Sequence, residues 1–279
     1  MLELLRYFGL PTFSASTQGP AIDNINVLAH WLMALLFVGW GAFFIYTLFR
    51  FRASKNPKAN YQGIRSHFSS YLEVVIGVIE VVLLLGFAIP IWASRVNDVP
   101  KGPDAIHIRV VGQQFAWNIH YPGPDGVFGA ISVDLVDEVE NPIGLDRSEE
   151  FAKDDIFTVN QLHIPVNTPI NISLSTKDVI HSFTLTELRV KQDAIPGMEI
   201  PVWFEATMTT DELLEEIKGT AREGRGFEIA CAQLCGLGHY RMKGFMTIHE
   251  MDGYEAWLAE EQEYLSEEEE DDWEDDWED

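Results

Sequence analysis

The feature that most constrains this chain is a run of 25 residues, Ile25 to Phe49, without a formally charged side chain. About 20 helical residues cross the roughly 30 Å hydrocarbon layer of a bilayer, so this run predicts a membrane-spanning helix. A second apolar run, from about Leu72 to Ser94, is also long enough to span. Together they predict a helical hairpin in a membrane over residues 25–94, preceded by an extramembrane segment, residues 1–24.

Positive charges indicate the orientation of the hairpin. The connecting stretch Arg50 to Ser70 holds five Lys or Arg residues, whereas Arg6 alone precedes the first span. Because basic loops stay in the cytoplasm, both chain ends are predicted on the outer side of the membrane. The apolar patch Phe8 to Phe13 is too short for the core of a signal peptide, so we expect residues 1–24 to be retained.

The second predicted span contains two acidic residues, Glu73 and Glu80. Seven residues apart on a helix, they share one face. Carboxyl groups at membrane depth are costly and normally face protein or water. We therefore expect Glu73 to face protein or water within the membrane, or to lie at the membrane interface with its carboxylate hydrated.

From about Pro100 the sequence changes to short alternating runs separated by glycine and proline. Strands are predicted at 106–111, 115–121, 170–175, 202–206, 227–230 and 245–249. Many short strands with frequent turns indicate a sandwich or a Greek-key barrel. Residues 134–160, acidic and weakly patterned, predict a surface excursion. Residues 252–265 predict a terminal helix whose apolar side chains pack on the barrel.

The net charge of −25 argues against nucleic-acid binding, which requires a basic face. Fourteen of the last twenty residues are Asp or Glu, and none is Lys or Arg. We expect this tail, residues 260–279, to be largely disordered at its end when unbound. It is either a solubilising appendage or, with Trp273 and Trp277 as apolar anchors, a surface for a basic partner such as cytochrome c.

Four potential metal ligands, Cys231, Cys235, His239 and Met242, fall within twelve residues. Thiolates, imidazoles and thioethers are the soft or borderline ligands that copper prefers. A disulfide would leave the histidine and the methionine unexplained, and a thioether is a poor zinc ligand. A mononuclear blue-copper site needs only one thiolate, so the second cysteine suggests two coppers that share both sulfurs. His181 is the best candidate for a further imidazole.

These motifs closely resemble subunit II of haem-copper cytochrome c oxidase. The matching segments are Cys231 to Met242, Asp178 to Phe183 and Lys191 to Gly197, and the similar organisation extends from about residue 20 to 260. The resemblance implies a membrane-anchored α+β protein, in which a two-helix transmembrane hairpin precedes an extracytoplasmic, cupredoxin-like Greek-key β-barrel at residues 95–259. It also implies a bacterial plasma membrane protein with both termini and the copper domain in the periplasm.

The resemblance further implies a binuclear copper centre. Cys231 and Cys235 would bridge the coppers, His181 and His239 would each bind one, and Met242 would be a weak ligand. Gln233 would contribute its main-chain carbonyl. The family's Glu at this position also helps to hold magnesium at the border with subunit I, and a neutral amide is a poorer ligand for that hard cation.

Other family positions concern electrons and protons. Phe115 stands where many relatives have the tryptophan that receives an electron from cytochrome c, and Trp117 matches the second aromatic. Both are candidates for the docking surface, with core packing as the alternative for Trp117. Glu73 stands where the family often has a glutamate bordering a proton-uptake route. The histidines without ligand-like neighbours are predicted at the surface or in the core: His67, His107, His120, His163 and His249.

The function implied by the resemblance is electron transfer in a proton-translocating respiratory oxidase. The chain would accept electrons from cytochrome c, or from a cytochrome c domain of another complex, and pass them to haem in subunit I, where oxygen is reduced to water. Its partners would be subunits I and III and the lipid bilayer. A nitric oxide reductase subunit shares the ligand motif. A quinol oxidase subunit II shares the hairpin and barrel but typically lacks the copper ligands.

Overall fold

The computed structural model describes residues 13–58, 61–63, 66–102 and 105–275, with side chains described as far as residue 265. Its contacts divide the chain into two units. One is the helical unit Pro20–Asp98, and the other joins the N-terminal residues up to Gly19 with Val99–Asp279. Half of the N-terminal segment that we expect to be retained, residues 1–12, lies outside the described residues.

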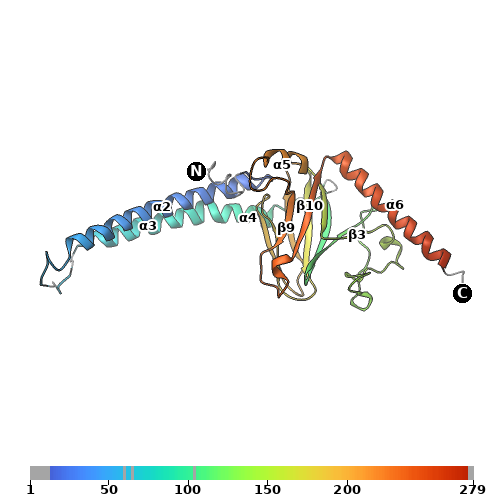
Figure 1. The fold of residues 1–279 in the computed structure, drawn as a ribbon, viewed down its shortest axis with the longest axis horizontal. Helices are drawn as coiled ribbons and strands as arrows, with labels where there is room; N and C mark the ends of the chain where they lie inside the picture. Colours follow the sequence, from blue (N-terminus) through green and yellow to red (C-terminus); the bar gives the residue numbers. More distant parts are fainter. Residues whose placement is uncertain (1–12, 59–60, 64–65, 103–104, 276–279) are drawn as a thin grey trace. The chain divides into compact units, whose positions relative to one another are not determined.

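The helical unit contains the two apolar helices that the sequence predicts. Helix α2 covers Gly19–Arg50, and the chain then reverses direction into α3, Phe68–Leu83 (Figure 1). A π-helical turn, Leu84–Ala88, joins α3 to α4, Ile89–Asn97. Pro90 lacks the N–H that an α-helix would use at this point, which explains the wider turn just before it. Both helical segments are long and apolar enough to cross a membrane.

The second unit is built on two five-stranded sheets (Figure 1). The first has the order β3 (Ile156–Val159), β2 (Ala116–Tyr121), β1 (Ile106–Gln113), β5 (Pro169–Thr176) and β8 (Ile200–Glu205). The second has the order β4 (Gln161–Pro165), β10 (Lys243–His249), β9 (Phe227–Cys231), β6 (His181–Leu185) and β7 (Val190–Ala194). All six predicted strands are present, and the two-helix, β-domain architecture is confirmed.

Apolar side chains that alternate along the strands form one core between the two sheets. On β5, Ile170, Ile172 and Leu174 are buried in the same cluster as Phe183 of β6 and Ile229 of β9. Strand β5 pairs parallel with β1, and β4 pairs parallel with β10, whereas the other pairs are antiparallel. Parallel neighbours require crossover connections, so each sheet joins segments that are far apart in the sequence.

The excursion predicted at residues 134–160 is only partly irregular. It contains the short 3-10 turns Val133–Leu135 and Glu150–Ala152, but it ends in strand β3, which pairs with β2. Ile143, Leu145 and Ala152 also form a small buried cluster of their own. The surface prediction is therefore wrong for these residues, because scattered apolar side chains without periodicity were enough to bury part of the segment.

Two further helices complete this unit. Helix α5, Thr210–Glu216, begins with a capping box in which Thr209 and Glu212 satisfy each other's backbone N–H groups. Helix α6, Met251–Asp275, packs on the sheets through Tyr254 and Trp257. Helix α6 continues ten residues past its predicted end, to Asp275, and the end of the tail, where we expect disorder, lies outside the described residues. Glutamate is a good helix former, which favours this continuation.

Candidate metal centre

Strand pairing brings the first two candidate ligands together. His181 is the first residue of β6 and Cys231 is the last residue of β9. These strands pair antiparallel, with Phe183 opposite Cys231, so the two ligands lie at the same end of the sheet. The chain then forms a loop that carries Cys235, the short 3-10 turn His239–Arg241 and Met242 before it enters β10.

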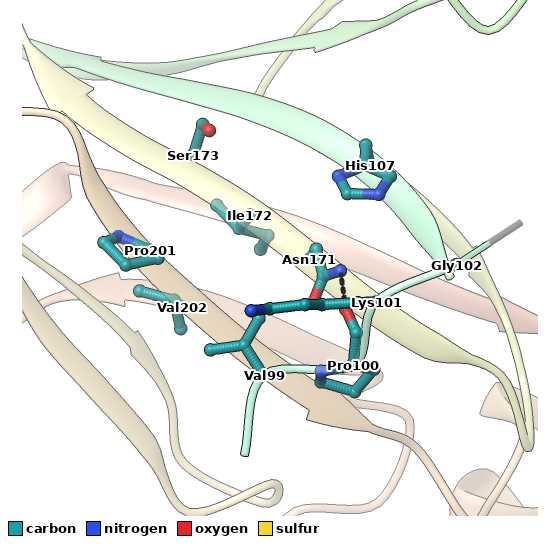
Figure 2. A pocket seen from close by; sticks show the side chains of 10 residues that line it. All are labelled: Val99, Pro100, Lys101, Gly102, His107, Asn171, Ile172, Ser173, Pro201 and Val202. Atoms are coloured by element: carbon teal, nitrogen blue, oxygen red, sulfur yellow. Dashed lines mark hydrogen bonds between the residues drawn. The ribbon is translucent and has the colours of Figure 1, made fainter. Parts of the chain in front are cut away.

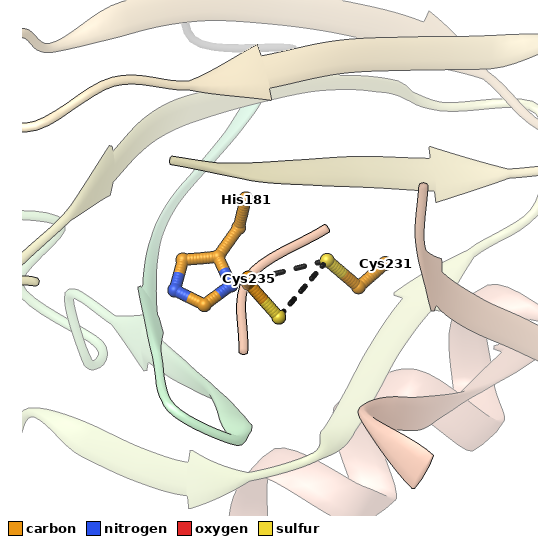
Figure 3. Close-up of side chains that lie close together, drawn as sticks. All are labelled: His181, Cys231 and Cys235. Atoms are coloured by element: carbon orange, nitrogen blue, oxygen red, sulfur yellow. Dashed lines mark hydrogen bonds between the residues drawn. The ribbon is translucent and has the colours of Figure 1, made fainter. Parts of the chain in front are cut away.

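The candidate ligand atoms converge on one small space. The two Sγ atoms lie 3.8 Å apart, and Cys231 Sγ is 3.9 Å from His181 Nδ1. Cys235 Sγ is 3.6 Å from His239 Nδ1 and 3.7 Å from Met242 Sδ. Figure 3 shows the two thiols and the His181 imidazole directed toward one another. Both cysteines are free, since a disulfide requires about 2.05 Å between its sulfurs.

The Gln233 main chain also borders this space. Its carbonyl oxygen accepts a hydrogen bond from the Cys231 thiol at 3.2 Å. The carbonyl is therefore close enough to one sulfur to complete a ligand set, as the resemblance implies. The structure thus brings together all six residues of the predicted ligand set.

Burial protects most of the site from water. His181 is fully buried, and Cys235 and Met242 are each only 3% exposed. Burial, and then the neighbouring Cys231, raise the pKa of the Cys235 thiol to about 11. Because metals bind the thiolate, a cation must displace this proton, and its own charge then compensates for the buried anion. The donor set of two sulfurs, two imidazoles and a thioether therefore fits a soft or borderline metal such as copper.

Asp178 fixes the orientation of His181. The sequence motif Asp178 to Phe183 includes this residue, but the motif alone predicts no role for it. Its Oδ1 accepts from His181 Nε2 at 2.8 Å, which leaves Nδ1 facing the sulfurs. Burial raises the pKa of the Asp178 carboxyl, but hydrogen bonds from His181, Val179 and Gln114 outweigh burial, and the net pKa lies below its usual value. A carboxylate that holds the outer nitrogen of a histidine is a common support for a metal ligand.

The two candidate aromatic residues differ in exposure. Trp117 is fully buried and packs edge-on against His181 and Phe183, with ring centroids 6.0 and 5.5 Å away. Its side chain cannot contact a partner directly, so of the two alternatives for Trp117 the structure supports core packing. Phe115 is half-buried against residues 232–242, the loop between β9 and β10 that we call the ligand loop, near Gly236 and Gly238. On that loop Leu234, Leu237 and Tyr240 are at least 80% exposed.

The remaining histidines lie away from this centre. His67 and His107 are exposed, and buried His120 is bonded to Asp155 at 2.6 Å. His163 and His249 contact each other at 2.9 Å between their ring nitrogens. Among the residues that the structure describes, His181, Cys231 and Cys235 form the one group of three His, Cys, Asp or Glu side chains placed to share a metal ion.

A separate pocket of about 320 Å³ lies on β1, β5 and β8 beside residues 99–102. Figure 2 shows Asn171 in this pocket, donating to the Pro100 carbonyl oxygen at 2.9 Å, with His107 and Lys101 nearby. The pocket holds no cysteine and none of the candidate ligands. Glu73 and Glu80 lie on α3 in the helical unit, and both are exposed in the isolated chain.

Comparisons with known proteins agree on one family. The family model described as "Cytochrome C oxidase subunit II, periplasmic domain" matches residues 106–248. The alternative cytochrome c oxidase subunit 2 of Bradyrhizobium diazoefficiens is 31% identical over 251 residues, which are 90% of this chain and 83% of the relative. Cytochrome c oxidase subunit 2 of Cereibacter sphaeroides is 26% identical, over 92% of this chain and 84% of the relative.

Solved structures give a weaker likeness. The periplasmic domain of cytochrome oxidase subunit II from Bradyrhizobium japonicum is 27% identical, with a TM-score of 0.39, and the match covers 60% of this chain and 99% of that domain. A haem-copper terminal oxidase dimer is 16% identical, with a TM-score of 0.34, and the match covers 64% of this chain and 99% of that one.

Proposed function

The chain belongs to the cytochrome c oxidase subunit II family, and on that premise we propose that it accepts electrons from cytochrome c on behalf of a respiratory haem-copper oxidase. The observation that carries the proposal is the convergence of two thiols, two imidazoles and a thioether through contacts of 3.6 to 3.9 Å. A zinc site or a mononuclear copper site would not use all of these ligands, because a thioether is a poor zinc ligand and a mononuclear copper site needs only one thiolate.

In this proposal the thiolates of Cys231 and Cys235 and the imidazoles of His181 and His239 would hold two coppers. Met242 is the weak ligand, and Gln233 contributes its main-chain oxygen. When bound, the copper pair supplies a one-electron relay between cytochrome c and the haem of subunit I. Oxygen is reduced on subunit I, so this chain makes or breaks no substrate bond.

The protein's own part is to hold these ligands still. The pairing of β6 with β9 fixes the backbones of His181 and Cys231, and Asp178 fixes the His181 ring through Nε2. Burial of His181, Cys235 and Met242 excludes water from most of the centre. A ligand set that is already in place needs little rearrangement when charge changes, and small rearrangement favours fast electron transfer.

The rest of the chain supports a place in a membrane complex. The two apolar helices anchor the subunit beside subunits I and III, and the copper domain faces the periplasm of a bacterial cell. Phe115, against the ligand loop, remains the candidate contact for cytochrome c, and Glu73 the candidate border of a proton-uptake route. The amide of Gln233 argues against magnesium at the border with subunit I.

Copper loading of the full chain tests the proposal. The wild type should bind two coppers per chain and give the EPR signal of one electron shared by two metals. His181→Ala and Cys235→Ser should abolish that signal, whereas Met242→Leu should retain copper with a shifted potential. One copper per chain with an ordinary mononuclear spectrum would contradict the proposal. Oxygen consumption by the copurified haem subunit would separate an oxidase from a nitric oxide reductase.

A further inference from the structure

Gln114 contacts both segments that carry the candidate ligands, the one around His181 and the one around Cys235. It lies in the tight turn between β1 and β2, directly before Phe115. Neither of the metal-binding motifs includes it, and it is 64 residues from Asp178 and 121 residues from Cys235 in the sequence.

Two hydrogen bonds from Gln114 reach the two sides of the centre. Its backbone N–H donates to Asp178 Oδ2 at 2.6 Å, on the carboxylate whose other oxygen holds His181. Its side-chain Nε2 donates to the main-chain oxygen of Cys235 at 2.5 Å. One residue therefore contacts the support of an imidazole ligand and the backbone of a thiol ligand.

The ligand loop is shaped around this side chain. Gly236 has φ of +133°, a conformation that residues with a Cβ rarely adopt, and a Cβ at this position would lie 2.5 Å from Gln114 Nε2. Gly112, in strand β1 two residues before Gln114, lies against the His181 ring, where a Cβ would come within 3.1 Å of Cδ2. The β1–β2 hairpin thus lies directly against both ligand segments.

We propose that Gln114 is a positioning residue that sets the distance between the His181 and Cys235 segments, and with it the geometry of the copper centre. The inference rests on the proposed function, because it concerns a centre built from these ligands. Residues that orient metal ligands typically change metal affinity by about 10- to 100-fold when they are replaced. Gln114 acts on a backbone oxygen and is exposed to water, so the lower end of that range applies.

The chemistry of the side chain makes a discriminating substitution available. Gln114→Glu keeps the size of the side chain and the backbone bond to Asp178, but it places an acceptor oxygen against the acceptor oxygen of Cys235. Gln113→Glu is the matched control, with the same change one residue away. The Gln113 Oε1 accepts from Asn118 at 3.0 Å, and a glutamate can still accept there.

The experiment uses the full chain in detergent, loaded with copper, and measures copper loss to a chelator, EPR hyperfine splitting and midpoint potential. Gln114→Glu should lose copper about tenfold faster than the wild type, with altered splitting and potential, while Gln113→Glu behaves as the wild type. Wild-type release, splitting and potential in Gln114→Glu would overturn the inference. The inference would also be overturned if Gln114→Glu and Gln113→Glu lowered the melting temperature equally and left the spectra unchanged, because that result indicates a general effect on stability.

A metal-free measurement separates this inference from the proposed function. Hydrogen exchange at the amides of 236–239 should be faster in metal-free Gln114→Glu than in metal-free wild type or Gln113→Glu, because the loop has lost its anchor. If the wild type took up no copper, the proposed function would fail, and this exchange would still decide whether Gln114 ties down the loop. Unchanged exchange would overturn the inference.

Discussion

Gly238→Ala should destabilise the ligand loop by driving a methyl group into the Phe115 ring. A Cβ at this position would lie 2.6 Å from both Cγ and Cε2 of Phe115, nearly 1 Å inside the 3.4 Å where ordinary contact begins. Gly238 itself has φ of −92° and ψ of 6°, which alanine can adopt. The whole effect should therefore come from the collision with Phe115 and not from backbone strain.

The magnitude follows from the cost of overpacking. Forcing an extra methyl group into a packed site costs about 1–3 kcal/mol, and the loop or the ring must move to relieve it. For a domain of this size, 1 kcal/mol lowers the melting temperature by about 2–4 °C, so the variant should melt roughly 2–12 °C below the wild type. The measurement is thermal unfolding of the full chain in detergent, followed by tryptophan fluorescence.

A double-mutant cycle makes this prediction specific. Phe115→Ala removes the ring, so adding Gly238→Ala in that background should cost little, and the two changes should couple by about 1–3 kcal/mol. Gly226→Ala is the control, because a Cβ there would meet only Thr210 Cγ2 at 3.8 Å. Its effect should stay within about 0.5 kcal/mol. Additive effects of Gly238→Ala and Phe115→Ala, or a Gly238→Ala protein that melts like the wild type, would refute the reasoning.

Three further predictions follow from other parts of the chain. Burial, and then the neighbouring His249, lower the pKa of His163 from 6.5 to about 4. As pH falls below 6.5, the unfolded state therefore binds a proton before the folded state does. The stability that is present above pH 6.5 is lost as pH falls toward 4. The melting temperature of His163→Phe, which keeps a ring beside Trp257, should therefore fall less between pH 7 and 4.5 than that of the wild type; parallel curves would contradict this. Reporter fusions at Lys58 and near Gly253 should report opposite sides of the membrane, and a shared side would mean that one span does not cross. Deleting 266–279 should slow cytochrome c oxidation at low salt and have little effect near about 0.5 M, where charges are screened; equal rates at every salt concentration would leave the tail without a steering role.

Strands that the sequence predicts are those with enough apolar residues to alternate, such as β5. The missed strands have physical reasons for being inconspicuous. Strand β7, at the edge of its sheet, carries Lys191, Gln192 and Asp193, and β4 ends in a proline. Strand β6 lies inside its sheet but begins with buried polar residues, His181 and Ser182, and His181 belongs to the candidate metal centre. Local rules often fail where a site imposes its own residues.

Some other features of the structure could have been predicted from a local sequence pattern, and others could not. The capping box of Thr209 and Glu212 is a local signature that would have predicted α5. Burial of Trp117 could not be read from alternation, because β2 is buried on both faces from Trp117 to Tyr121. The ligands on one loop are visible from their spacing. The contact between Gln114 and Cys235 joins residues 121 positions apart, and no local pattern encodes it.

The pairing of β6 with β9 also has a consequence for the order of events as the chain matures. His181 and Cys231 are 50 residues apart, and they become neighbours only when these strands have found each other. Pairings between such distant segments form slowly, because the loop between them must be closed first. Until then Cys231 and Cys235, only four residues apart, are a flexible dithiol without an imidazole beside them. A newly made chain should therefore pass through an interval in which its sulfurs are open to oxidation, and the length of that interval is set by how quickly the second sheet closes.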